Sequence, residues 1–162
     1  MVCRFALMSS VLVGLLLITC GAQAHELRPA VADVAIAQSQ MEVELQVTVE
    51  SLLAGIDHTQ VMDTDEAPQA KTYDRLRDLP DQALMELVRA EWPMLARGFL
   101  VEGAGPLNLV GVEVIAEPNL DLPRDTILTM QAVLSLGNGP VALGWVAQNG
   151  GLVVRHGDAE TA

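Results

Sequence analysis

Two segments of the chain alternate apolar and polar residues, which is typical of strands with one buried and one solvated face. From Met41 to Glu50 every odd position is apolar and every even position is polar. From Leu128 to Leu136 the even positions are apolar. A weaker strand at residues 31–37 precedes a turn at 39–40, so the first pair predicts an antiparallel hairpin.

Between these strands the hydrophobic period changes to that of a helix. Pro80 and Asp81 suit the first helical turn, and Leu84, Val88 and Leu95 follow at helical spacing. We therefore predict a helical insertion at about residues 80–97. Pro93 lacks a backbone donor, so we expect the helix to kink or restart there. The polar segment 57–71 predicts an exposed loop.

Further short strands are expected after the insertion. Residues 107–116 place Val110, Val112 and Val114 on one face, and the Asn-Gly at 149–150 predicts a hairpin between strands 141–147 and 152–156. The fold class is therefore mainly β, an antiparallel β-sandwich-like domain with one helical insertion, and an α+β arrangement stays open. The predicted core comprises Val43, Leu45, Val47, Leu84, Val88, Trp92, Leu128, Met130, Leu134, Trp145 and Val153.

The first 24 residues have the three parts of a secretory signal. Arg4 supplies the positive charge, an apolar stretch follows, and Ala22-Gln23-Ala24 offers small residues for cleavage before His25. Retention as a membrane anchor and lipidation at Cys20 are alternatives that we rank lower. We expect a signal at 1–24, one exported β-rich domain at 25–156 and a polar tail at 157–162. The predicted location is the periplasm or the periplasmic face of the inner membrane.

Charge and cysteine content exclude several classes of function. After residue 24 the chain has eight basic and 21 acidic residues, a net charge of −13, and no cysteine. Nucleic-acid binding needs clustered lysine and arginine, so it is excluded as a role. Disulfides and thiolate metal sites are excluded in the exported part. The acidity also disfavours adhesion to anionic lipids.

Short motifs recur in order through residues 24–156. They are Ala24-His25-Glu26-Leu27-Arg28-Pro29-Ala30, Tyr73-Asp74-Arg75-Leu76-Arg77, Leu79-Pro80 with Trp92-Pro93, Leu122-Pro123-Arg124-Asp125, Gly144-Trp145 and Gly151-Leu152-Val153-Val154-Arg155. In order and spacing they resemble the N-terminal extracytoplasmic domain of HupE/UreJ-like membrane proteins.

The resemblance implies a β-rich exported domain that precedes a bundle of membrane helices, in a family linked to hydrogenase and urease accessory functions and to nickel handling. After residue 24 this sequence has no apolar segment of membrane-spanning length. We therefore expect a non-enzymatic exported module that works with a membrane-protein partner or with a C-terminal membrane module missing from this chain.

The candidate metal ligands are His25, His58 and His156. Cleavage after Ala24 would give His25 a free α-amine beside its imidazole, a pair that suits copper or nickel. The alternative function is therefore a periplasmic Cu- or Ni-binding protein. The three histidines have no recognised ligand spacing, so no cofactor is assigned with certainty.

Enzyme motifs are missing from the sequence, and we predict that the chain is not an enzyme. It has no Gly-x-Ser-x-Gly elbow and no phosphate-binding glycine loop. Glu42, Glu44 and Glu50 are expected on the solvated face of a strand. Asp63 and Asp65 lack the glycine and the closing glutamate of a calcium loop.

The first test concerns the mature N-terminus. Mass spectrometry of the exported protein should find His25 as its first residue. This form should bind one Cu²⁺ or Ni²⁺ ion more tightly than a variant extended by one residue before His25, because the extension displaces the amine. Binding should weaken in acid, where protons compete for both nitrogens. Equal affinities would leave only diffuse attraction to the acidic chain.

Overall fold

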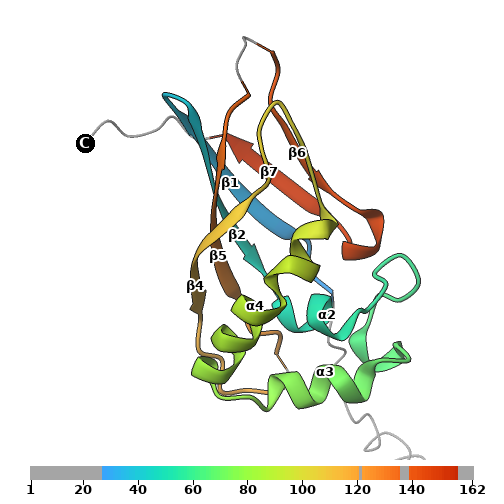
Figure 1. The fold of residues 1–162 in the computed structure, drawn as a ribbon. Coiled ribbons are helices and arrows are strands. Elements are labelled where there is room, and N and C mark those ends of the chain that lie inside the picture. Colours follow the sequence, from blue (N-terminus) through green and yellow to red (C-terminus); the bar gives the residue numbers. More distant parts are fainter. Residues whose placement is uncertain (1–26, 121, 136–138, 157–162) are drawn as a thin grey trace, which may run out of the picture.

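The fold was analysed in a computed structural model of the chain, which describes residues 27–120, 122–135 and 139–156. The signal 1–24, His25 and the tail 157–162 lie outside these ranges. Figure 1 shows the order of the elements. The strands are β1 (Ala30–Ala37), β2 (Gln40–Val47), β3 (Phe99–Glu102), β4 (Asn108–Val114), β5 (Thr126–Val133), β6 (Ala142–Trp145) and β7 (Leu152–His156), and the α-helices are α2 (Val49–Ala54), α3 (Ala70–Arg77) and α4 (Asp81–Leu95).

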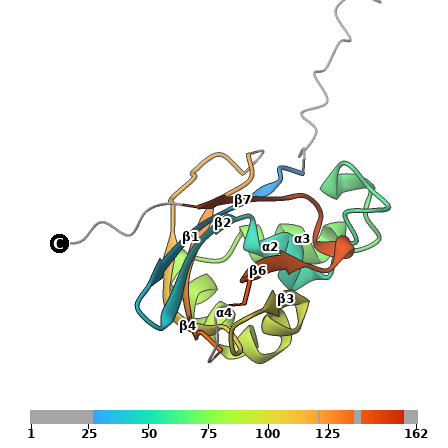
Figure 2. The ribbon, with the colours of Figure 1, turned by 90° about the horizontal axis from the view of Figure 1, so that it is seen from above.

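The molecule is mainly β, as the alternation predicts. Five strands form one sheet in the order β4-β5-β2-β1-β7, and β3 pairs with β6 in a second, two-stranded sheet. Figure 2 shows the large sheet on one side, with the helices and the β3–β6 pair on the other. The layers are sandwich-like, but helices supply much of the second layer.

The core lies between these two layers. The predicted strand faces are confirmed, because Val43 and Leu45 of β2 and Leu128 and Met130 of β5 are almost completely buried. Leu84 and Val88 of α4, together with Trp145 of β6, close the core from the other side. Trp92 and Leu134 are only partly buried and pack at its margin.

The predicted hairpin at Asn149-Gly150 is wrong. β6 pairs antiparallel with β3, whereas β7 pairs parallel with β1 at the sheet edge. Gly150 has φ 85° and ψ −158°, which is not the turn conformation that Asn-Gly favours, and a short 3₁₀ turn at Ala147–Asn149 precedes it. The large sheet is therefore mixed rather than wholly antiparallel.

The same parallel pairing explains why Val153 is not in the core. Its partner in the register is Val31, which lies on the uncovered face of the sheet, and 48% of Val153 is exposed. Val110 also leaves its predicted face and is 56% exposed. The register of β4 against β5 shifts between Leu109 and Gly111, because a bulge there turns Val110 outward.

The helical part is larger than one insertion. α2 follows β2 directly, and the expected loop at 57–71 contains a 3₁₀ turn at Thr64–Glu66 and the start of α3. α4 continues through Pro93 without a restart, because this proline lies in its last turn, after most of the helical hydrogen bonds have formed. Within the described residues, no helix combines the length and apolarity needed to cross a bilayer.

The second test concerns Trp145. Its side chain is 9% exposed, the centroid of its ring lies 6.2 Å from that of Phe99, and its Nε1 donates to the carbonyl of Gly150. Trp145→Ala should lower the free energy of unfolding by about 3–5 kcal/mol, measured in urea. The exposed Val153→Ala is the control and should change it by about 0.5 kcal/mol or less. A loss below about 1 kcal/mol in the tryptophan variant would contradict this packing.

Candidate functional site

The structure does not bring the described histidines together. His58 follows α2, and its backbone N–H donates to the carbonyl of Gln148 (2.9 Å), two residues before Gly150. His156 is the last residue of β7 and pairs with Val34. Since strands rise about 3.3 Å per residue, the length of β7 separates the two imidazoles. Among the described residues, no group of three or more His, Cys, Asp or Glu gathers as metal ligands.

His58 lies in a tight, partly buried position. A Cβ atom added to Gly150 would lie 2.6 Å from its Nδ1, so the ring packs directly against the glycine backbone. Its Nε2 is buried and has no hydrogen-bond partner. Burial lowers the pKa of His58, and the nearby Asp57 only partly opposes this shift. The imidazole is therefore held neutral at physiological pH.

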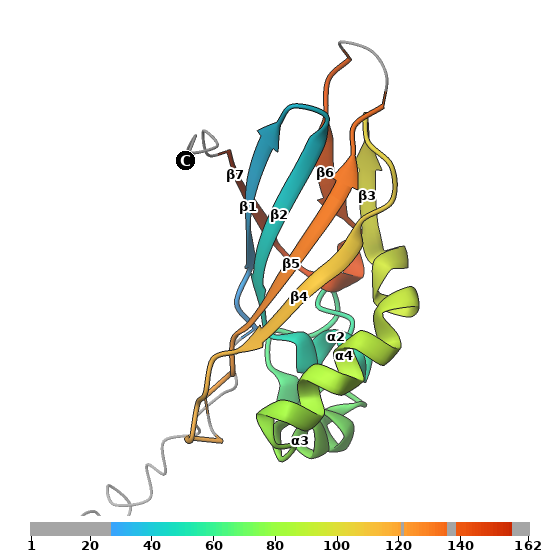
Figure 3. The same ribbon diagram turned by 60° about the vertical axis from the view of Figure 1, so that its left-hand side comes forward.

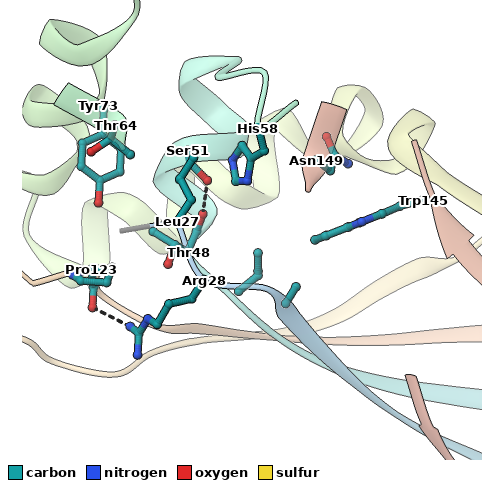
Figure 4. Close-up of a pocket in the computed structure, with 12 residues that line it drawn as sticks. Leu27, Arg28, Thr48, Ser51, His58, Thr64, Tyr73, Pro123, Trp145 and Asn149 are labelled. Carbon is teal, nitrogen blue, oxygen red and sulfur yellow. Dashed lines mark hydrogen bonds between the residues drawn. The ribbon is translucent and has the colours of Figure 1, made fainter. Parts of the chain in front are cut away.

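A small cavity adjoins this histidine (Figure 4). Its volume is about 10 Å³, which matches one water molecule rather than a substrate. Thr64 also lines it, is 1% exposed, and has a hydroxyl without a hydrogen-bond partner. A shallower groove of about 250 Å³ shares Leu27, Arg28 and His58 with the cavity.

The groups around His58 do not form an acid–base relay. Asp57 accepts hydrogen bonds from the backbone and hydroxyl of Thr59, and the hydroxyl of Ser51 donates to the carbonyl of Thr48. The Asp57 carboxylate and the Ser51 hydroxyl, which could otherwise serve as a base and a nucleophile, thus hydrogen-bond to groups other than His58. In the described part of the chain, this cavity offers a neutral hydrogen-bonding group but no activated nucleophile.

The sequence did not predict the buried charged residues, which are Glu50, Arg77 and Arg124. Glu50 was expected on a solvated strand face, but β2 ends at Val47 and α2 turns the glutamate inward, where it is fully buried. Arg124 Nε donates to Glu50 Oε1 (2.9 Å), and Arg77 Nη1 lies 3.7 Å from the same oxygen. We call these three residues the buried ion cluster. Burial raises the pKa of Glu50, and the two arginines oppose that shift.

Both arginines of the cluster also bind main-chain carbonyls. Arg124 donates to those of Leu76 and Leu79, and Arg77 donates to those of Asn119 and Leu122. Arg124 additionally reaches the carboxylate of Asp81 at the start of α4 (2.9 Å).

Arg28 lies close to the same loop that carries Arg124. Residues 73–77 and 122–125 supply the two arginines, and Arg28 of the segment 24–30 donates to Pro123 and Asp125. Because the cluster joins helix ends and a loop, its chemistry is that of a structural brace.

One face of the five-stranded sheet packs on the core, and the opposite face is covered by no described helix. We call this opposite face the bare face. The strand registers align Thr129, Glu44, Asp33 and Arg155 in one row across four strands. Asp33 and Arg155 form an ion pair, which lowers the pKa of Asp33 through hydrogen bonding. In Figure 3 the helices lie to the right of and below the strands, and the side chains of Glu44, Asp33 and Arg155 in this row are exposed.

Comparison with protein-family models, with curated proteins and with solved structures gives no match.

The third test concerns His58. Its pKa is lowered in the folded state, whereas the unfolded chain titrates near 6.5, so the unfolded state binds more protons below that pH. Stability should therefore fall as the pH decreases from about 7.5 to about 5. His58→Gln should flatten this slope, and the exposed His156→Gln should not. Urea unfolding at each pH measures the effect, and equal slopes in all three proteins would contradict it.

Proposed function

We propose that this chain is a non-enzymatic exported module that binds a protein partner at the periplasmic face of the inner membrane. The observation that carries the proposal is the bare face of the five-stranded sheet. On this face the exposed Val153 lies opposite Val31, beside the row of charged side chains, and such a surface can pack against a partner. The secretory signal expected at residues 1–24 supports the location.

The interior gives further support for binding rather than catalysis. The cavity at His58 has room for about one water molecule, and the buried ion cluster is occupied by contacts within the chain. The resemblance to the extracytoplasmic domain of HupE/UreJ-like proteins suggests the kind of partner, a membrane protein or membrane module linked to nickel handling.

A second candidate is metal binding at the mature N-terminus. Leu27 and His58 line the same groove, and Leu27 is only two residues after His25. His25 itself lies outside the residues that the structure describes. His156 does not belong to such a site. Copper or nickel are the ions that this donor set favours.

The fourth test maps the partner in cells. A photo-crosslinking amino acid at Gln131 lies on the bare face, and the same residue at Met94 of α4, which is 44% exposed, serves as the control. Irradiation should join the Gln131 variant to an inner-membrane protein and leave the Met94 variant uncoupled. Recovery of the Gln131 variant as free protein only, or equal coupling from both positions, would contradict a partner on this face.

A further inference from the structure

The bare face carries an unbalanced set of charges. Asp33 of β1 lies directly opposite Glu44 of β2, and Glu42 follows on the same face two residues earlier. All three side chains are exposed. Arg155 is the cation that the registers place in these rows, and it is bound to Asp33. Two carboxylates are therefore left without a cation across the strands.

The ion pair with Arg155 offsets the charge of Asp33, so the excess negative charge on this face comes from Glu42 and Glu44. The other described cations do not compensate. Lys71, Arg75, Arg89 and Arg97 lie on helices or on the 3₁₀ turn that follows α4, and Arg77 and Arg124 belong to the buried ion cluster. Arg28, at the edge of the sheet, is paired with Asp125. Neutral residues such as Thr129 and Gln131 surround the carboxylates.

An apolar strip runs beside the acidic row. Val31 and Val153 face each other across β1 and β7, and Ile127 lies in the same row beyond Gln46. Lysine and arginine bury their alkyl stems on apolar surface while their charged ends reach polar groups. The strip and the carboxylates together match such side chains.

We propose that the bare face docks an extended segment of a partner protein in which lysine or arginine residues alternate with uncharged ones. The inference rests on the proposed interaction role and names the chemistry of the partner. A second copy of this chain does not fit, because it would bring another net charge of −13 and the same carboxylates to the contact. An anionic membrane surface is disfavoured for the same reason.

The test uses the exported protein and a short synthetic peptide of alternating lysine and threonine. Isotope-labelled protein is titrated at low salt, and amide shifts report both affinity and location. Glu42→Gln with Glu44→Gln should weaken binding about tenfold or more, and the shifts in the wild type should map to β1, β2 and β5. Added salt should weaken the wild-type complex, because the contacts are exposed.

The matched control is Glu86→Gln with Glu91→Gln on α4, which removes the same charge from exposed positions on the other side of the molecule. It should change the affinity by less than about twofold. Equal weakening by both pairs, shifts confined to the helices, or no binding would overturn the inference. If Gln131 still couples to a membrane protein in that case, the interaction role survives and only the charge of the partner is wrong.

Discussion

The helical end of the molecule depends on one buried carboxylate. Glu50 is fully enclosed and is held by Arg124 and Arg77, which are themselves only 4% exposed. Removing three charges from water is costly, and their mutual attraction offsets that cost only when the remaining donors find acceptors. Four main-chain carbonyls from α3, the α3–α4 connection and the loop before β5 accept hydrogen bonds from Nη2 of Arg77 and from Nη1 and Nη2 of Arg124, whereas Nε and Nη1 of Arg77 and Oε2 of Glu50 are buried without a hydrogen-bond partner among the described residues.

These contacts connect segments that are far apart in sequence. Arg124 lies 74 residues after Glu50, and its bonds to Leu79 and Asp81 fix the point where α4 begins. α4 then runs across one face of the large sheet and contributes Leu84 and Val88 to the core. Because the cluster places the helices on that face, the other face is left bare, and the proposed docking surface is a consequence of the same packing.

The sequence predicted those elements whose own periodicity determines their burial. β2 and β5 alternate without interruption, and the apolar stripe of α4 is regular, so burial on the correct face followed from residues such as Val43, Leu128 and Leu84. The parallel pairing of β7 with β1 was missed, because a parallel partner is chosen by packing over the whole chain and not by the nearest turn. The alternation of apolar and polar residues in 107–116 does not reveal the bulge that exposes Val110.

The buried ion cluster was missed for a related reason. In the sequence Glu50 continues the polar face of β2, and only the change from strand to helix at Val49 turns it inward. The arginines that meet it lie 27 and 74 residues later in the sequence, and no local pattern indicates that they contact Glu50. Of the candidate metal ligands, His58 and His156 lie at opposite ends of β7. Their spacing in the sequence could not reveal this separation, because it depends on the tertiary fold.

A double-mutant cycle on Glu50 and Arg124 tests the central claim most directly. The free energy of unfolding is measured in urea for the wild type, Glu50→Gln, Arg124→Met and the double variant. Each single change should cost about 3–5 kcal/mol, because it breaks the direct hydrogen bond between two buried charged groups, and the double variant should lose less than the sum. Single losses below about 1 kcal/mol, or losses that simply add, would show that the cluster does not hold the helices on the sheet.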